Sequence, residues 1–402
     1  MSRAFQFLIV FLLAFTHAGC VIGPGQLEND LLSYNTALRD GFREQILLNL
    51  VRTRYGESNE YLAVESVATQ YLVQHDAAVS GTLTEAAGNI LGLSGSTTFN
   101  ERPTVTYAPT QQCSKFNAQL RRPLSAEVLH YLIDDGFPKE VVLHLAVRRI
   151  NGLRNSDSIC GPEPVDVPAF DRFCEFVQHA SYLFANRQIE IHHLDQWQNR
   201  STAIEKSIVN AEDLISAKKS GYELRSEDGG EHFVLQEEES QLMLLIDPTA
   251  EGSPAVTTVQ NLLELAPDRA TYELEVGTES SFHKAIEPDH TDIHISTRSY
   301  SGLMSYLAPA VTVPERHLRA GLVADCDPGC ACPIVPFRVC VSRHRPKHAC
   351  VAVPHRGYWF YVDERDHDSR MILRLLVDVA RVQLSCEDMP DSGPTLTLPL
   401  GN

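Results

Sequence analysis

Apolar residues recur at every third or fourth position along several stretches of the chain, which is the period of one helical face. The series nearest the N-terminus is Leu31, Tyr34, Leu38, Phe42 and Ile46. Gly136 and Pro138 predict a break between two helices, and Asn151-Gly152 is expected to close the second. Thr297 or Ser299 is placed to cap a later helix. The predicted helical regions are 31–50, 114–152, 168–188, 256–265, 297–311 and 369–384.

Other stretches alternate apolar and polar residues, which predicts strands. Residues 60–74 fit both periods, and we favour a strand because β-branched and aromatic residues are frequent there. Two alternating segments around Asp228-Gly229-Gly230 predict a hairpin over 221–236. Further predicted strands are 104–109, 240–248, 271–277, 292–296, 337–343, 349–363 and 395–400. Because no regular βαβ rhythm appears, we expect an α+β fold with mixed helices and mainly antiparallel sheet.

The domain organisation follows from length and composition. A chain of 402 residues is long enough for about two to three domains. Small and polar residues over 81–101 predict a flexible loop, and the Gly/Pro-containing "VIGPGQ" predicts a tether. The expected segments are a signal peptide (1–19), a lipidated tether (20–28), an N-terminal helix and strand region (29–155), a middle α+β region (156–295) and a C-terminal α+β region (296–402) with a cysteine-rich insertion at 324–350.

The first residues have the layout of an export signal. Arg3 precedes an apolar run from Phe5 to Phe15, and small residues follow at Ala18 and Gly19. The run is too short to span a bilayer of about 30 Å. We therefore expect the chain to leave the cytosol.

"Ala-Gly-Cys" at the end of this run is similar to a bacterial lipobox, in which the cysteine is acylated and the chain is cut before it. Cys20 is then the lipidation site, carrying palmitate-type acyl chains. His17 stands where Leu is usual, so a plain cut after Ala18, or an uncleaved start, stays open. Val21 is not the Asp that retains such proteins at the inner membrane. The expected location is the outer membrane, facing the periplasm.

Two blocks of sequence resemble a known family. The first contains "YNTALRDGFREQILLNLVRTRYGE", "AVESVATQY", "TVTYAP" and "AVRRING"; the second contains "STRSYSGLMSYLAPAVTVP", "YWFYVDERDHDSRMILRLLVDVARVQLS" and "PTLTLPLGN". Together they resemble a family of bacterial exported lipoproteins without an established activity. The resemblance covers about residues 29–155 and 296–402 and supports lipidation of Cys20. It implies no catalytic residues, and the insertion at 324–350 departs from the family pattern.

The charge balance argues against a nucleic-acid partner. Lys and Arg number 34 against 52 Asp and Glu, a formal net charge of −18. Such a chain repels a phosphate backbone unless it presents a local basic patch. The basic clusters are short, and solvated faces account for them: Arg121-Arg122, Arg148-Arg149 and Arg343 to Lys347. We expect no nucleic acid to bind.

The cysteines allow two interpretations. In an oxidising exported compartment, disulfides are the default. Cys340 and Cys350 flank an expected hairpin turn and are candidates to pair across it, and Cys326 is a candidate to pair with Cys330 or Cys332. Alternatively, Cys326, Cys330 and Cys332 with His344 or His348 supply four zinc ligands. A C-x-x-C redox motif is absent from the sequence.

Two clusters of carboxylates and imidazoles could ligate a hard metal ion. One comprises Asp289, His290, Asp292 and His294, and the other Asp366, His367 and Asp368 within "YVDERDHDSR". The simpler interpretation of the second is helix capping by Asp366 or Asp368. "QIEIHHLDQW" is a weaker cluster of the same kind.

The expected function is that of a membrane-anchored envelope lipoprotein that binds another envelope protein or supports an assembly. We expect no cofactor and no catalytic residues. The alternatives are an exported metal-assisted hydrolase that uses the Asp/His clusters, and a metal-binding envelope module built on the cysteine-rich insertion. The sequence specifies neither substrate nor partner.

Overall fold

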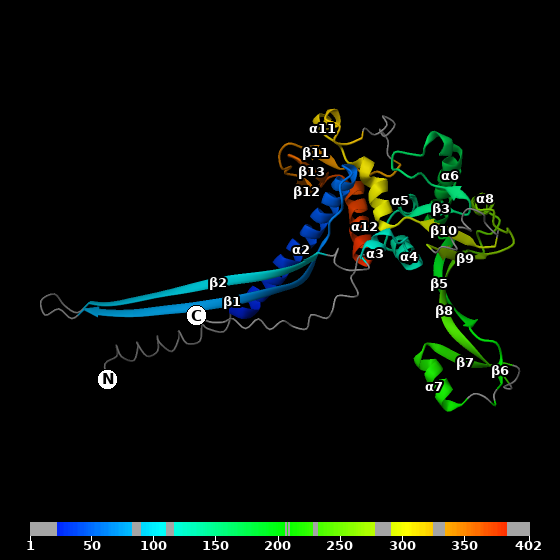
Figure 1. Cartoon of the computed structure of the whole chain (residues 1–402), viewed down its shortest axis with the longest axis horizontal. Coiled ribbons are helices and arrows are strands. Elements are labelled where there is room, and N and C mark those ends of the chain that lie inside the picture. The colour runs from blue at the N-terminus through cyan, green and yellow to red at the C-terminus, as the bar shows by residue number, and fades with distance from the viewer. Residues whose placement is uncertain are drawn as a thin grey trace. The chain divides into compact units, whose positions relative to one another are not determined.

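The computed structural model (Figure 1) describes residues 22–82, 90–109, 116–205, 207, 210–227, 232–277, 291–324 and 334–383. The chain forms two compact units, one of Met1–Asn59 with Gln119–Ser385 and the other of Glu60–Ala118 with Cys386–Asn402. Helices and mainly antiparallel sheets make up the described residues, which confirms the α+β class. The expected signal peptide, Cys20 and the strand at 395–400 lie outside the described residues.

The described part of the larger unit starts with a long helix, α2 (Ile22–Arg54). Its 33 residues rise about 50 Å at 1.5 Å per residue. The tether expected over 20–28 is therefore helical from Ile22 onward. Pro24 is compatible with this because it lies in the first turn, where its missing N–H leaves no hydrogen bond unmade.

The two ends of α2 differ in burial. Ile46, Leu47 and Leu50 near its C-terminal end have no exposed surface. Leu31 and Leu32 are 66% and 63% exposed. The C-terminal turns therefore belong to the core of the larger unit, and the N-terminal turns do not.

The larger unit contains a main sheet of eight strands. Its strand order is β4-β3-β10-β9-β8-β5, and β6 and β7 also pair with β8. Neighbouring strands are antiparallel except for β9 and β10, which are parallel. The predicted strands in this part of the chain are confirmed. The bounds are β3 (Val147–Ile150), β4 (Leu153–Arg154), β5 (Ile189–Asn199), β6 (Ile204–Glu205), β7 (Tyr222–Glu227), β8 (His232–Ile246), β9 (Thr271–Val276) and β10 (Ile293–Thr297).

Asn151-Gly152 forms a hairpin turn between β3 and β4 and does not close a helix. Both residues have positive φ, 38° and 81°, as the type I′ turn of a two-residue hairpin requires. The preceding helix ends earlier, at Ala146. The Asn151 amide also donates to the carbonyl of Asp292 at 2.9 Å and accepts from the N–H of His294 at 2.8 Å. The turn is thereby tied to β10.

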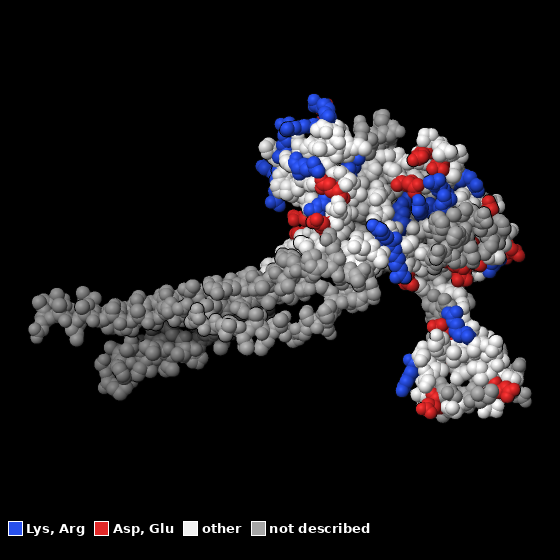
Figure 2. Space-filling view, viewed as in Figure 1, with Lys and Arg blue, Asp and Glu red and all other residues white. Residues whose placement is uncertain are grey.

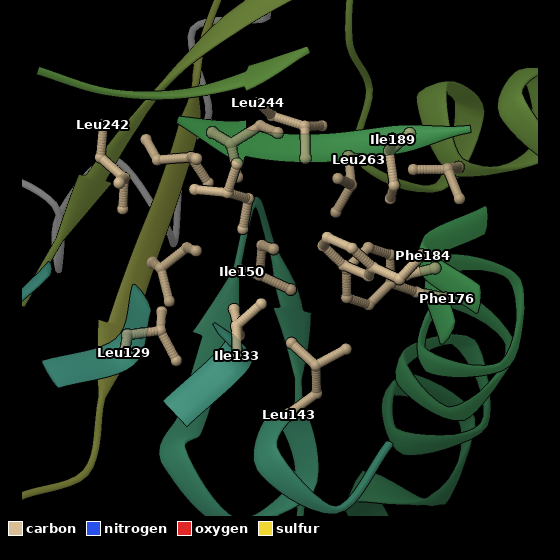
Figure 3. Close-up of a pocket in the computed structure, with 16 residues that line it drawn as sticks. Leu129, Ile133, Leu143, Ile150, Phe176, Phe184, Ile189, Leu242, Leu244 and Leu263 are labelled. Carbon is tan, nitrogen blue, oxygen red and sulfur yellow. The ribbon is translucent and has the colours of Figure 1, made fainter. Parts of the chain in front are cut away.

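The helices of this region were largely predicted. Ser125 and Ser253 cap two of them by accepting hydrogen bonds from Val128 N–H and Val256 N–H. The side chains of α4, α5, α6 and α8 meet those of the main sheet in one apolar core (Figure 3). The bounds are α3 (Phe116–Arg121), α4 (Ala126–Asp134), α5 (Lys139–Ala146), α6 (Val167–Ala185), α7 (Ala211–Lys219) and α8 (Pro254–Leu262), with a 3₁₀ turn at Pro164–Asp166.

The C-terminal region has a second sheet with the strand order β11-β13-β12. The single strand expected at 349–363 is two strands, because Arg356-Gly357 forms a turn with φ of 47° and 83°. Helix α12 packs against both α2 and α10 (Figure 1). The bounds are α10 (Tyr300–Leu307), α11 (Glu315–Arg319), β11 (Cys340–Ser342), β12 (Ala349–His355), β13 (Tyr358–Asp363) and α12 (His367–Gln383), with a 3₁₀ turn at Ala308–Ala310.

The smaller unit contains a long hairpin, β1 (Leu62–Thr82) and β2 (Ile90–Pro109). The strands are antiparallel, with the register running from Leu62↔Pro109 to Thr82↔Ile90. The strand favoured at 60–74 is confirmed and extends further. The flexible loop expected over 81–101 is wrong from Ile90 onward, since pairing with β1 places these small polar residues in a strand.

Across the described ranges, no helix is both long enough and apolar enough to cross a membrane.

Candidate functional site

The disulfide expected between Cys340 and Cys350 does not form. Both are free thiols. The strand order β11-β13-β12 places β13 between the strands that carry them. Two strand spacings amount to about 9.5 Å, which exceeds the roughly 7 Å between Cα atoms that a disulfide can bridge. The two flanking strands were predicted, but not the insertion of a later strand between them.

Cys160, which the sequence did not single out, is disulfide-bonded. Cys174 is a further free thiol, and burial raises its pKa to about 11. The carbonyl of Ile159, next to Cys160, accepts a hydrogen bond of 3.0 Å from the N–H of Ile334. Ile334, within the cysteine-rich insertion, therefore lies beside Cys160. The other disulfide candidates, Cys326, Cys330 and Cys332, lie outside the described residues.

The acidic segment before α12 acts as a helix cap. The Asp366 carboxylate accepts hydrogen bonds from the N–H of Ser369 at 3.1 Å and from its hydroxyl at 2.8 Å. His367 and Asp368 form the first turn of the helix. The capping interpretation is thus confirmed for Asp366, whose negative charge lies at the positive end of the helix dipole.

Only half of the other Asp/His cluster lies within the described residues. Asp289 and His290 lie outside the described residues. The Asp292 carboxylate accepts from the N–H of Glu273 at 3.2 Å. His294 is fully buried in β10, with its Nδ1 3.4 Å from the Glu275 carboxylate. Within the described part of the chain, no three His, Cys, Asp or Glu side chains gather as they would around a metal ion.

Histidines of the "QIEIHHLDQW" strand line an open pocket of about 350 Å³ beside α4. The rings of His130 and His193 meet edge to face at 4.8 Å, and His130 Nε2 lies 3.4 Å from the Asp134 carboxylate. His192 forms its own pair with Glu190 at 2.8 Å. His130 and His193 therefore contact each other, whereas His192 pairs separately with Glu190, and the three imidazoles do not form one cluster.

An apolar cavity lies between the main sheet and the helices that cover it (Figure 3). Its lining is entirely hydrophobic and includes Leu129, Leu143, Ile150, Phe176, Leu244 and Leu263. The volume of about 40 Å³ leaves room for on the order of one to three water molecules, which need polar partners to stay. This cavity is a packing void of the core and is too small for an organic ligand.

A polar cluster fixes the C-terminal end of α2 to the C-terminal sheet. It comprises Tyr55, Glu57, His317, His355 and Arg356, which we call the α2 joint. The Tyr55 hydroxyl lies 2.7 Å from Nδ1 of His317 in α11. The Glu57 carboxylate accepts from Nε of Arg356 at 2.8 Å and lies 3.4 Å from Nε2 of His355. Three separate segments of the chain therefore meet at the end of the helix.

Burial sets the protonation of the α2 joint. It raises the pKa of Tyr55 to about 12. It also lowers the pKa of His317 and of His355, and the nearby Arg356 cation acts in the same direction on both. Tyr55 and both imidazoles are therefore uncharged at neutral pH. A neutral tyrosine held by a neutral histidine positions the helix and is poorly suited to nucleophilic attack.

A second polar cluster surrounds Arg298, which is 5% exposed. Its Nη1 donates to the carbonyls of His144, Leu145 and Val147 at 2.8–3.0 Å. Its guanidinium lies 4.3 Å from the ring centroid of Tyr306. Burial lowers the pKa of Arg298 to about 10. The side chain satisfies carbonyls left open at the end of α5, which is a structural role.

Basic side chains gather around α11 and β11–β13 on one face of the larger unit (Figure 2). The sequence had pointed to the segment from Arg343 to Lys347. Arg343, Arg345 and Lys347 are exposed. This agrees with the solvated face expected for them.

Sequence reasoning missed Tyr55, His317, His355, Arg298 and Cys160. Their partners are distant along the chain, as shown by Tyr55 and His317, which are 262 positions apart. No spacing within one segment marks such residues. The nearest signal is that Tyr55 and Arg298 fall within the two sequence blocks that resemble the lipoprotein family.

Comparison with known proteins adds no relative. No family model matches the chain, and neither the curated proteins nor the solved structures yield a significant match. The resemblance to exported lipoproteins stays a prediction.

Proposed function

We propose that this chain is a bacterial envelope lipoprotein, held in the outer membrane by acyl groups on Cys20, whose body binds another envelope protein. The observation that carries the proposal is the arrangement of α2. The helix begins at Ile22, two residues after Cys20, and its other end is fixed in the larger unit through the α2 joint. A lipid on Cys20 would therefore be joined to the body by a stiff helix.

Exposed apolar side chains on the same helix support the binding of a partner. Leu31, Leu32 and Leu38 are 66%, 63% and 40% exposed. Large apolar side chains grouped on one exposed element are typical of protein contact surfaces. The N-terminal turns of α2 are the part of the larger unit that we propose as the contact.

The anchor is tested by mass spectrometry of the mature N-terminus and by fractionation of a Cys20→Ser variant. We expect the native chain to begin at an acylated Cys20 and to sediment with membranes, because several acyl chains hold a protein stably. Cys20→Ser should be released. Cys174→Ser, which changes a half-buried free thiol, is the matched control and should stay with the membrane. A native chain that starts at Met1 without fatty acid refutes the anchor.

The partner surface is tested separately. Leu31→Glu with Leu32→Glu should abolish chemical cross-links to envelope proteins while membrane attachment is kept. Val165→Glu, at another exposed apolar position (81% exposed), should leave the cross-links unchanged. Identical cross-links in the native chain, the double variant and Val165→Glu would show that α2 is not the contact surface.

A further inference from the structure

A surface cavity of about 360 Å³ lies in the larger unit between α2, α12 and the turn that joins α4 to α5. Small-molecule sites in proteins have volumes of about 300–1,000 Å³, so the cavity is large enough for a ligand. Side chains spaced three and four residues apart share one face of a helix. Such a face of α12 forms one wall of the cavity and consists of His367, Arg370, Met371 and Arg374.

The lining of this cavity carries more positive than negative charge. It contains the guanidinium groups of Arg43, Arg370 and Arg374 and a single carboxylate, that of Asp135. The carboxylate is already engaged, because it accepts a hydrogen bond from Arg374. Guanidinium groups around one cavity repel one another unless an anion lies among them. This local excess of positive charge contrasts with the formal net charge of −18 for the whole chain.

Arg374 is held by contacts within the protein. Besides its bond to Asp135, it donates through Nε to the Asp378 carboxylate at 3.3 Å. Its guanidinium also lies 5.1 Å from the ring centroid of Phe137. These contacts join α12 to the turn between α4 and α5. Arg374 therefore fixes one wall of the cavity, and the other two guanidinium groups are left for a ligand.

Arg43 and Arg370 keep hydrogen-bond donors that a ligand could use. Nη1 of Arg370 donates to the backbone carbonyl of Glu364 at 3.0 Å, and among the described residues no carboxylate forms an ion pair with this guanidinium. Nη1 of Arg43 lies 4.0 Å from an oxygen of Asp40 that also accepts from Nε of Arg39 at 2.9 Å. Both positive charges are therefore weakly compensated. They lie on two different helices, so they can approach an anion from two sides.

A bulge places a cysteine in the same lining. The register of β12 against β13 shifts between Ala349 and Val351, so Cys350 is an extra residue at this point. A bulge turns a side chain away from the regular alternation of its strand. Cys350 is a half-buried free thiol that lines this cavity and also a neighbouring one with Arg345 and Lys347. Its reactivity therefore reports on whether the cavity is filled.

We propose that this cavity binds a phosphate group through the guanidinium groups of Arg43 and Arg370. A phosphate presents oxygens in several directions, which suits two guanidinium forks on separate helices better than a planar carboxylate does. Phe137 and Met371 in the same lining can contact the organic part of the ligand. The phosphate belongs to a soluble organic phosphate or to a lipid headgroup. The proposal depends neither on the membrane anchor nor on the partner surface of α2.

Protection of Cys350 from alkylation tests the proposal. The full chain carries Cys20→Ser, so that no acyl group inserts into the vesicles used as probes. The probes are inorganic phosphate and, separately, phosphatidylcholine vesicles with and without phosphatidic acid, all at one ionic strength. Peptide mass spectrometry gives the alkylation rate of each thiol. Cys174, a free thiol outside the lining, is the internal control, and acetate is the carboxylate control.

We expect phosphate to slow the alkylation of Cys350 and to leave Cys174 unchanged, whereas acetate should have no effect. Protection by inorganic phosphate would indicate a soluble ligand. Protection by phosphatidic acid vesicles alone would indicate a lipid headgroup. Unchanged alkylation of Cys350 with every phosphate probe would overturn the proposal, as would equal protection by acetate.

Paired variants test the two arginines. Arg43→Gln with Arg370→Gln should weaken the binding of the protecting probe about tenfold or more, because each fork supplies charge-assisted hydrogen bonds. Arg172→Gln with Arg319→Gln removes the same charge at exposed positions and should leave binding unchanged. Arg43→Lys with Arg370→Lys keeps the charge without the forks and should give an intermediate affinity, which also serves if the glutamine pair does not fold. Equal binding by the parent chain and the lysine and glutamine pairs would overturn the proposal.

Discussion

His144 shows how burial fixes the charge of a single residue. It is 4% exposed and packs edge to face against Phe173 at 5.6 Å. Burial lowers its pKa to about 4, and the Arg298 cation acts in the same direction. An unfolded histidine titrates near 6.5. The unfolded chain therefore takes up this proton at a higher pH than the folded chain does.

We predict that acid weakens the fold through His144. The stability due to its neutral form is complete above about pH 6.5 and is lost as the pH falls toward 4, on the order of 3 kcal/mol. His144→Leu should remove this part of the pH dependence, as measured by urea unfolding at neutral pH and near pH 4. His344→Leu, at an exposed position, should behave like the native chain. An unchanged acid response in His144→Leu would exclude His144 as its source.

At the residue scale, local signals were predictable and distant ones were not. Ser299 was one of two expected caps, and its hydroxyl accepts from the N–H of Gly302 at 3.1 Å. A cap and its target lie three residues apart, so sequence spacing reveals them. Arg298 is adjacent in sequence, but its carbonyl partners lie about 150 positions away. Only the folded chain brings them together.

At the element scale, Gly277 marks a close approach at the end of β9. Its φ is +68°, and a Cβ atom there would lie 2.5 Å from the carbonyl oxygen of Leu124. Gly252 has the same φ, yet a Cβ atom there would meet nothing within 4 Å. An alanine at either position would suffer the strain of a left-handed backbone, but only an alanine at Gly277 would also collide with a neighbouring atom.

We predict that Gly277→Ala costs about 2 kcal/mol or more beyond the cost of Gly252→Ala. In both variants the left-handed backbone conformation of the alanine lowers the free energy of unfolding by about 1–2 kcal/mol. Only Gly277→Ala must also displace a backbone carbonyl. Denaturant midpoints of the two variants give the difference directly. Equal losses would mean that the β9 end moves away from Leu124 freely.

Elements were predicted well where one period dominates, as in α6 and α12. They were predicted poorly where pairing between strands determines the secondary structure. Residues 90–101 are small and polar, and they form a strand because β1 supplies its backbone partner along the whole length. The order β11-β13-β12 likewise arises because β13, the last of the three strands in the sequence, inserts between the other two. Sequence periodicity carries no information about such an order.

At the scale of the whole molecule, we expect the disulfide of Cys160 to join two segments that are far apart along the chain. Cys332 lies two residues before Ile334, whose N–H is bonded to Ile159. We therefore predict a Cys160–Cys332 bond, seen as a linked peptide in a digest made without reduction. Reduction should lower the free energy of unfolding by about 2–5 kcal/mol. Recovery of alkylated Cys160 from the unreduced chain would contradict the bond.

The α+β class was predictable at this scale because it depends on the mixture of periods. The division into two units was not, since the smaller one takes Glu60–Ala118 out of the N-terminal region and joins it to the C-terminal tail. The expected boundaries at 155 and 295 instead fall inside the larger unit.

The stiffness of α2 has a consequence for encounters between copies. A helix of about 50 Å fixed at one end in the body and joined at the other to a bilayer would hold every copy at the same height. Molecules so confined meet by drifting in a plane, at a local concentration far above that in free solution. Even a weak lateral attraction between copies would then suffice to form clusters. These clusters would disperse once the protein is released from the membrane.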